Sequence, residues 1–311
     1  MDLSTPAVLA ARPPKNAVDV RRPYAFFVER EPSAEGDMVD VATVFLTDRE
    51  CPWRCLMCDL WKNTIDGPTP PGAIPEQIDY ALARLPPARQ IKLYNSGNFF
   101  DSQAVPPDDH AAIVRRVGRF ERVIVENHPK LCGDACPRFR DACGSELEVA
   151  LGLETVHPEV LPRLNKGMTL DDFARAAEFL LASKIAVRAF LLLRPPFLSE
   201  KEGAEWAIRS LEYAFSLGVG CCAIIPTRGG NGIMEQLAAA GLFSPPTIRS
   251  LEQVLEHGLS LGRGRVLADL WDIDRFFDCP DCGPRRAARI AQMNLSQQVA
   301  PKVTCSHCEP M

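Results

Sequence analysis

The chain has 311 residues, of which 46% are hydrophobic, and a formal net charge of −5. This is enough apolar material for the core of one large domain or two small ones. The negative balance gives no overall basic field, so tight nonspecific binding of nucleic acid is not expected, although a local basic patch would still suit a tRNA or nucleotide substrate.

The cysteine content and the apolar stretches indicate the cellular compartment in which the protein is expected. Twelve cysteines would suggest disulfides in a short secreted chain, but no charged and then apolar signal peptide opens this sequence. We therefore expect a cytoplasmic protein whose cysteines bind metal. The most apolar stretch, Phe179–Leu193, is interrupted by Lys184 and Arg188, so no membrane segment is expected.

The first part of the chain differs from the rest. Residues 1–36 carry five prolines and no periodic pattern, which predicts a flexible or loosely docked leader over most of this stretch. From residue 38 onward, short β-rich runs alternate with amphipathic helical patterns. The expected strands are Val39–Leu46, Gln90–Tyr94, Arg122–Val125, Glu148–Leu153, Ala186–Leu193 and Gly220–Ile225. The expected helices are Pro75–Leu85, Asp108–Phe120, Leu170–Ser183 and Lys201–Leu217. Six such units predict a parallel sheet.

Local signals fix some element boundaries better than others. Thr169 and Ser199 each precede two acidic residues, which predicts capped helix starts at both positions. The segment Asn127–Ser145 contains several cysteines, prolines and glycines without a clean helical stripe. We expect a loop there.

The run Glu50–Asp59 contains the motif that says most about chemistry. Cys51, Cys55 and Cys58 follow a predicted strand with C-x3-C-x2-C spacing. Three thiolates in one loop can hold three corners of a [4Fe-4S] cluster and leave the fourth iron without a protein ligand, as a catalytic cluster requires. The alternatives are a zinc knuckle, which usually takes its four ligands in C-x2-C pairs, or three unrelated core cysteines.

The cysteine loop and its place after a strand resemble the radical S-adenosylmethionine (SAM) superfamily. The resemblance implies an α/β fold with a partial (β/α)6 TIM-type barrel, here over residues 37–270. It also implies that SAM chelates the open iron and that an electron from an external donor cleaves SAM to a 5′-deoxyadenosyl radical, which removes hydrogen from substrate. Active groups of α/β barrels gather at the C-terminal ends of the strands.

Polar residues follow the second and third expected strands. Asn95, Ser96 and Gly97 lie where the superfamily places the segment that receives the SAM amino group. That segment usually ends in an acidic residue, and here Asn98 stands in its place. As a bare sequence this segment is also an ordinary turn. Glu126 follows the third strand, where SAM's ammonium group would satisfy a buried carboxylate; an N-cap or a surface ion pair is the alternative.

The ends of the fourth and fifth strands carry the more specific resemblance. Together with the segment 94–101, the runs Gly152–Thr155, Asn165–Gly167 and Val187–Glu202 resemble the radical SAM subunit of archaeosine synthase, a tRNA-modifying family, across about residues 40–230. The resemblance implies SAM contacts by Glu154 and Lys166, whose alternative role is a ligand-free ion pair.

Three further side chains are candidates on weaker grounds. Arg188 and Arg194 would hold an anionic substrate or the SAM carboxylate, although both are equally suited to structural ion pairs. Met57, just before the third cysteine, occupies the position where the superfamily places an apolar residue near the adenine.

The C-terminal segment, residues 271–311, is predicted to be a small metal-binding tail. Its pairs Cys279/Cys282 and Cys305/Cys308 have the spacing of a zinc ribbon, which would also suit a second iron–sulfur cluster. Arg285, Arg286 and Arg289 between them indicate a basic helix or a solvated face. For Cys132, Cys136 and Cys143 the alternatives are a third metal site and free or loop-packing cysteines. Cys221 and Cys222 point to opposite faces of the sixth expected strand and are expected to be core residues.

These patterns predict a radical SAM enzyme, with tRNA nucleobase modification and a partner subunit implied by the archaeosine-type resemblance. A methyl- or methylthio-transferring radical SAM enzyme is a second reading. A non-catalytic zinc-binding module is the third.

Overall fold

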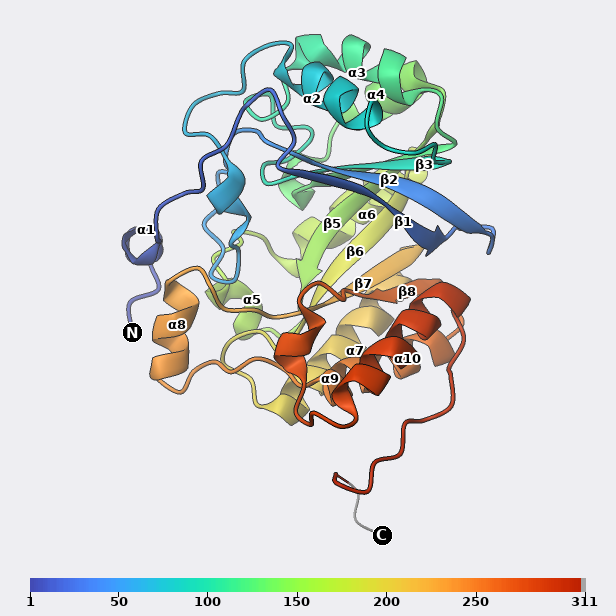
Figure 1. Ribbon diagram of the computed structural model, residues 1–311. Coiled ribbons are helices and arrows are strands. Elements are labelled where there is room, and N and C mark those ends of the chain that lie inside the picture. Colours follow the sequence, from blue (N-terminus) through green and yellow to red (C-terminus); the bar gives the residue numbers. More distant parts are fainter. Residues whose placement is uncertain (309–311) are drawn as a thin grey trace.

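The computed structural model describes residues 1–308, so the last three residues of the predicted tail, 309–311, lie outside the described residues. Its centre is an eight-stranded sheet in the order β1 to β8, curled into a half-barrel (Figure 1). The strands are β1 (Ala25–Pro32), β2 (Met38–Leu46), β3 (Gln90–Asn95), β4 (Arg122–Asn127), β5 (Glu146–Glu154), β6 (Ala186–Leu193), β7 (Cys221–Pro226) and β8 (Arg265–Ala268). β1 pairs antiparallel with β2, and β2 to β8 pair in parallel.

Helices cover the outer face of this sheet (Figure 1). The helices of the described chain are α1 (Thr5–Ala11), α2 (Ala73–Leu82), α3 (His110–Val117), α4 (Ala135–Cys143), α5 (Val160–Arg163), α6 (Leu170–Ala182), α7 (Glu200–Ser216), α8 (Ile233–Ala239), α9 (Ile248–Ser260) and α10 (Gly283–Ser296). Of these, α1 and α8 pack beside the cysteine loop and not on the outer face of the sheet. Short 3-10 turns are η1 (Leu60–Asn63), η2 (Pro107–Asp109), η3 (Pro129–Leu131) and η4 (Ile273–Phe276). Among the described residues, none of these helices has the length and apolar character needed to cross a membrane.

The two predicted helix caps are confirmed. The Thr169 hydroxyl accepts the Asp172 N–H at the start of α6, and the Asp172 carboxylate accepts the Thr169 N–H in return. Ser199 and Glu202 form the same reciprocal pair at the start of α7. Each pair satisfies two of the N–H groups that a helix start leaves without partners.

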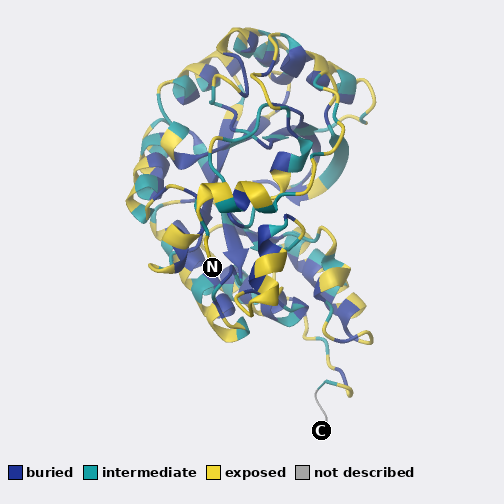
Figure 2. Ribbon diagram, turned by 90° about the vertical axis from the view of Figure 1, so that its left-hand side faces the viewer, coloured by how far each residue is buried: buried dark blue, intermediate teal, exposed yellow. Residues whose placement is uncertain are grey.

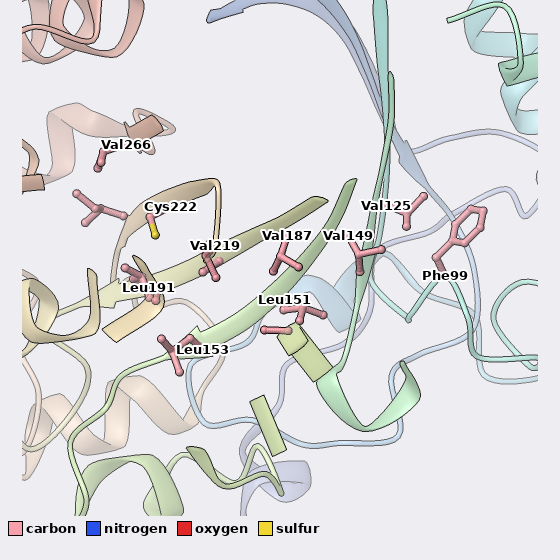
Figure 3. Packing of buried hydrophobic residues seen from close by; sticks show 14 of the residues in the cluster. Phe99, Val125, Val149, Leu151, Leu153, Val187, Leu191, Val219, Cys222 and Val266 are labelled. Atoms are coloured by element: carbon pink, nitrogen blue, oxygen red, sulfur yellow. The ribbon is translucent and has the colours of Figure 1, made fainter. Parts of the chain in front are cut away.

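Strand alternation divides the sheet into an apolar outer face and a polar inner face. On β5, Val149, Leu151 and Leu153 belong to the core beneath the helices (Figure 3). The residues that alternate with them, beginning with Glu148, lie on the opposite, inner face. Buried residues are accordingly concentrated on the strands, while the outer faces of the helices are exposed (Figure 2).

A charged layer fills the barrel interior near the N-terminal ends of the parallel strands. The Glu148 carboxylate is fully buried and accepts from Arg188 Nε at 2.6 Å, Arg265 Nη2 at 2.9 Å and Arg122 Nη1 at 3.0 Å. Arg265 also donates to the Pro32 carbonyl at 3.2 Å. Because Arg265 lies on β8 and Pro32 on β1, this contact joins the two edges of the sheet at this end.

Three predictions about the fold are corrected. The stretch 1–36 is not a leader without regular structure, because it contains α1 and the edge strand β1. The segment Asn127–Ser145 is not a loop, because it contains η3 and α4; its cysteines Cys136 and Cys143 lie on the buried side of that helix. The parallel part of the sheet has one strand more than the six predicted, because the short β8 gave no clear pattern.

The buried Glu148 carboxylate should be essential for stability. Glu148→Ala leaves three arginines without their shared partner, so we expect the free energy of unfolding to fall by about 3–5 kcal/mol, measured by urea denaturation followed by circular dichroism. Burial raises the pKa of Glu148, but Arg188, Arg265 and Arg122 outweigh it and hold the pKa below its ordinary value. The stabilisation should therefore be present above about pH 4.3 and be lost as the pH falls.

Glu146→Ala is the matched control. Glu146 also binds Arg122, but its side chain is 65% exposed, so its loss should cost at most about 1 kcal/mol. Equal stability of the two variants would contradict the role assigned to Glu148.

Candidate functional site

The cysteine loop begins just after β2 and is fixed by residues that are distant in sequence. The Leu56 N–H donates to the Leu164 carbonyl at 3.0 Å. The Asn231 amide donates to the Leu56 carbonyl at 2.6 Å and to the Cys58 carbonyl at 3.0 Å. The parts of the chain that follow β5 and β7 therefore position the loop at the C-terminal ends of the strands.

The N-terminal segment covers the outer side of this loop. Val8 of α1 belongs to an apolar cluster with Leu56 and with Ile233 of α8, and Figure 1 shows α1 beside α8. Arg12 pairs with Glu50 at 2.6 Å and also stacks over a tryptophan of η1. Met57 is partly buried against the same apolar cluster.

The three loop thiols lack a positive partner strong enough to ionise them. Burial raises the pKa of Cys55, and it raises the pKa of Cys58 to about 12; in both cases neighbouring loop thiols add to the increase. Without a metal these thiols stay protonated at neutral pH, so a cation that displaces the protons would be their natural partner. The Asn98 amide points a donor at the Cys51 sulfur, at 3.4 Å.

The spacing of the thiols also bears on the type of metal centre. Among the described residues, the group of potential ligands close enough to share a single ion is the C-terminal cysteine set, and the loop is not part of it. The loop thus lacks the compact arrangement of a zinc knuckle. A cubane cluster, in which each thiolate binds a different iron, suits such a set better.

Trp53 packs the cysteine loop against the turn after α5. Its ring stacks on His128 with centroids 3.5 Å apart, and His128 Nε2 contacts the Lys166 carbonyl at 3.0 Å. A Cβ at Gly167 would lie 2.7 Å from the Trp53 ring, so only glycine allows this packing. Burial lowers the pKa of His128 to about 3, so His128 is a neutral packing residue.

Glu154 and Lys166 meet beside the loop. The Lys166 ammonium binds the Glu154 carboxylate at 2.7 Å, and both side chains are buried. A register shift between Gly152 and Glu154, with a φ of 64° at Glu154, turns this side chain out of the regular strand pattern. Burial lowers the pKa of Lys166, but Glu154 and the nearby Cys55 raise it above its ordinary value. The structure therefore brings both predicted residues together as an ion pair.

The turn after β3 is packed more tightly than the sequence suggested. A Cβ at Gly97 would lie 2.6 Å from the Arg49 carbonyl and 2.7 Å from Asp48 Oδ2. Glycine is needed here so that the protein can pack against itself, rather than to admit a ligand. Asn95 and Ser96 are buried in the same turn, and the Asn95 amide donates to Asp48 Oδ2 at 2.5 Å.

Asp48 is a buried acid that the sequence analysis missed. Burial raises its pKa well above the ordinary value, and its Oδ1 atom makes no hydrogen bond, nor does Asn95 Oδ1. The available signal was its position between a buried strand and the cysteine loop, since an acid there needs a partner.

Glu126 lies at the end of β4 near this turn. Its Oε2 accepts the Asn95 N–H at 3.3 Å, and no ion pair of Glu126 occurs among the described residues. Burial raises the pKa of Glu126 to about 8. Neither an N-cap nor a surface ion pair therefore accounts for the Glu126 carboxylate. A cationic ligand beside it would stabilise its ionised form.

Arg188 lies below this site. Phe45, Tyr94 and Phe190 form an edge-to-face aromatic layer across the inner face of the sheet. Arg188 approaches the Tyr94 hydroxyl at 3.4 Å and pairs with Glu148 in the charged layer. The expectation that Arg188 binds a ligand is not supported by this position. Arg194 pairs with Glu200 and donates to the Pro245 carbonyl, as a structural arginine would.

The C-terminal cysteines converge as predicted for a metal site. The sulfur atoms of Cys279, Cys282, Cys305 and Cys308 all lie within 4.8 Å of one another. The neighbouring helix is not a free basic surface, because Arg286 and Arg289 both pair with Glu252 of α9.

Comparison with known proteins supports the predicted family. No protein-family model matches the sequence. The chain is 29% identical over 239 residues to archaeosine synthase subunit beta of Methanosarcina acetivorans, covering 71% of this chain and 67% of that protein. It is 32% identical over 175 residues to archaeosine synthase subunit beta of Thermococcus kodakarensis, which covers 53% of each chain.

Solved structures show the same fold at low identity. Streptococcus suis SuiB bound to S-adenosylmethionine matches with a TM-score of 0.55 and 10% identity, covering 74% of this chain and 49% of SuiB. Methylornithine synthase matches with a TM-score of 0.51 and 14% identity, covering 82% of this chain and 69% of that enzyme. The chain thus spans about half the length of SuiB and of the Thermococcus relative. In sequence the chain resembles archaeosine synthase subunit beta, and in fold it resembles SuiB and methylornithine synthase.

Proposed function

We propose that Cys51, Cys55 and Cys58 hold a [4Fe-4S] cluster and that SAM binds beside it. The observation that carries this proposal is the placement of three neutral, partly buried thiols at the C-terminal ends of the strands, next to Glu126 and the Glu154–Lys166 pair. When bound, the cluster and SAM would supply reductive cleavage to a 5′-deoxyadenosyl radical, with the electron coming from an external donor.

Two charged groups suit the two ends of SAM's methionine part. Glu126 forms no ion pair with another described residue, and an ammonium group beside it would lower its pKa and stabilise the ionised carboxylate. Lys166 would bind a carboxylate, provided that it shares or exchanges its present partner Glu154. Lys166 is buried and Glu126 is partly buried, so their interactions with a ligand would be less screened than those of exposed charges.

The surrounding residues support these groups. Asn95, Ser96 and Gly97 form the packed turn that supplies the Asn95 N–H to Glu126. Met57 would provide an apolar contact for the adenine. The Asn98 amide, as a donor to the Cys51 sulfur, would stabilise the more negative reduced cluster.

We propose a tRNA nucleobase as the substrate, with a second subunit as partner. Two relatives are named archaeosine synthase subunit beta, and a protein named as one subunit implies another. The net charge of −5 and the paired state of Arg286 and Arg289 give this chain little basic surface of its own at α10. A partner would then supply most phosphate contacts. The free cysteines agree with the predicted cytoplasmic location.

Two alternatives give different products. A methyl- or methylthio-transferring enzyme would release S-adenosylhomocysteine. A non-catalytic zinc module would be colourless and would not consume SAM; the open spacing of the loop thiols disfavours it.

Replacing Cys55 tests the cluster assignment. After anaerobic reconstitution, the unaltered protein should be brown, and with dithionite and SAM it should release 5′-deoxyadenosine, detected by chromatography. Cys55→Ala should lose the cluster absorbance and reduce 5′-deoxyadenosine formation at least about 100-fold, because one iron loses its ligand.

Cys143→Ala is the control for this experiment, since Cys143 lies on α4 in the core and should affect neither property. An unaltered protein that binds zinc but no iron would refute the enzyme proposal.

Replacing Lys166 tests the SAM site. Lys166→Met removes a buried ammonium while keeping most of the side-chain volume, so SAM should bind about 10- to 100-fold more weakly to the reconstituted protein. Isothermal titration calorimetry would measure this. Lys130→Met, at a half-exposed lysine after β4, should leave the affinity unchanged. Equal affinity in both variants would remove Lys166 from the site.

Isotope transfer tests the substrate class. Deuterated tRNA lacking the modification should raise the yield of 5′-deoxyadenosine and introduce deuterium into it, as read by mass spectrometry, because the radical takes hydrogen from substrate. Undeuterated tRNA is the control. If tRNA changes neither yield nor label, with the partner subunit present, the substrate proposal is wrong while the cluster assignment stands.

A further inference from the structure

The four C-terminal cysteines form a compact, mostly buried set. Cys279, Cys282 and Cys305 are buried and Cys308 is partly exposed. The sulfur atoms of Cys282 and Cys308 are 3.8 Å apart, and all four lie within 4.8 Å of one another.

These distances indicate how many metal atoms the site holds. Four sulfurs placed tetrahedrally at about 2.3 Å from one ion are about 3.8 Å from each other. A cubane cluster needs wider spacing, because each thiolate binds a different iron. We propose that these cysteines bind one tetrahedral zinc ion in a structural site, which goes beyond the radical reaction proposed above.

The ligand set is closed and consists of sulfur alone. The adjacent His307 and Asp281 face each other at 3.5 Å with side chains 77% and 61% exposed, so they lie outside the buried sulfur cluster. Four thiolates leave no open position for substrate or water, which is the pattern of a structural rather than a catalytic zinc ion.

The site closes a hairpin formed by α10 and the chain that follows it. α10 begins directly after Cys282, and Arg289 on this helix donates to the Pro301 carbonyl at 2.7 Å. Arg286 donates to the Val303 carbonyl at 3.3 Å. These contacts hold the returning chain along the helix and bring Cys305 and Cys308 back to Cys279 and Cys282.

The hairpin in turn covers the free edge of the barrel sheet. On β8, Val266 exchanges two hydrogen bonds with the Gln297 amide, at 2.8 and 2.9 Å. Ala268 exchanges two with the Asn294 amide, both at 2.8 Å. Two side-chain amides thus bind the backbone N–H and C=O groups of β8 that a further strand would otherwise pair with. They protect this edge from pairing with other chains. The zinc ion fixes the helix that presents them.

Metal analysis of a variant without the first cluster tests the proposal. The triple variant C51A/C55A/C58A, purified after zinc supplementation, should hold one zinc ion per chain and no iron by mass spectrometry of the metals. Replacing zinc by cobalt should give the intense visible spectrum of a tetrahedral tetrathiolate. Iron with inorganic sulfide in this variant, or no metal at all, would overturn the proposal. The result is independent of the radical SAM reaction, because this variant cannot perform it.

Two further measurements address the ligands and the structural role. Cys308→Ser in the triple-variant background should lower zinc affinity at least about 100-fold, whereas Cys143→Ser should not. If Cys308→Ser does not fold, zinc can be removed from the triple variant by a chelator. Hydrogen exchange at 266–268 should then become about tenfold faster or more, while 149–151 in β5 stays protected. Unchanged protection at 266–268 after zinc loss would refute the structural role.

Discussion

The buried carboxylate of Glu148 is the constraint on which the shape of the barrel depends. It binds arginines from β4, β6 and β8, and Arg265 of β8 reaches the backbone of β1. No backbone ladder joins β1 to β8, so side-chain charges close the sheet at its N-terminal end. The cysteine loop lies at the opposite end, away from this charged layer. Such a buried network must be complete, because any unpaired member would be costly.

The interior is arranged in layers that separate stability from chemistry. Ion pairs occupy the closed end, and the aromatic layer of Phe45, Tyr94 and Phe190 lies above them. Asp48 and Glu126, two acids whose pKa burial raises, lie above this layer together with the cysteine thiols. The same residue types therefore have opposite roles at the two ends of one barrel, and their position along the strand decides which role they take.

Much of the site could be predicted because its signals are local. The C-x3-C-x2-C spacing, the strand alternation and the helix caps all depend on neighbours within a few residues. The ion pairs of Arg188 could not be predicted, because its partners Glu31 and Glu148 are distant in sequence and spacing cannot show such pairing. β1 was missed because its alternation of apolar and polar residues is weak. Its extended conformation depends on pairing with β2, which the sequence does not show. The tight packing of Gly97 depends on Asp48 and Arg49, which only the folded loop brings close.

The contact of α1 with α8 has a consequence for the order of assembly. Val8 and Ile233, which both pack on Leu56, come from opposite ends of the chain, and contacts between such distant segments form late in folding. During synthesis, the cysteine loop emerges long before α8 can lock α1 in place. The loop thus stays uncovered on this side until α8 has been made and α1 has packed against it.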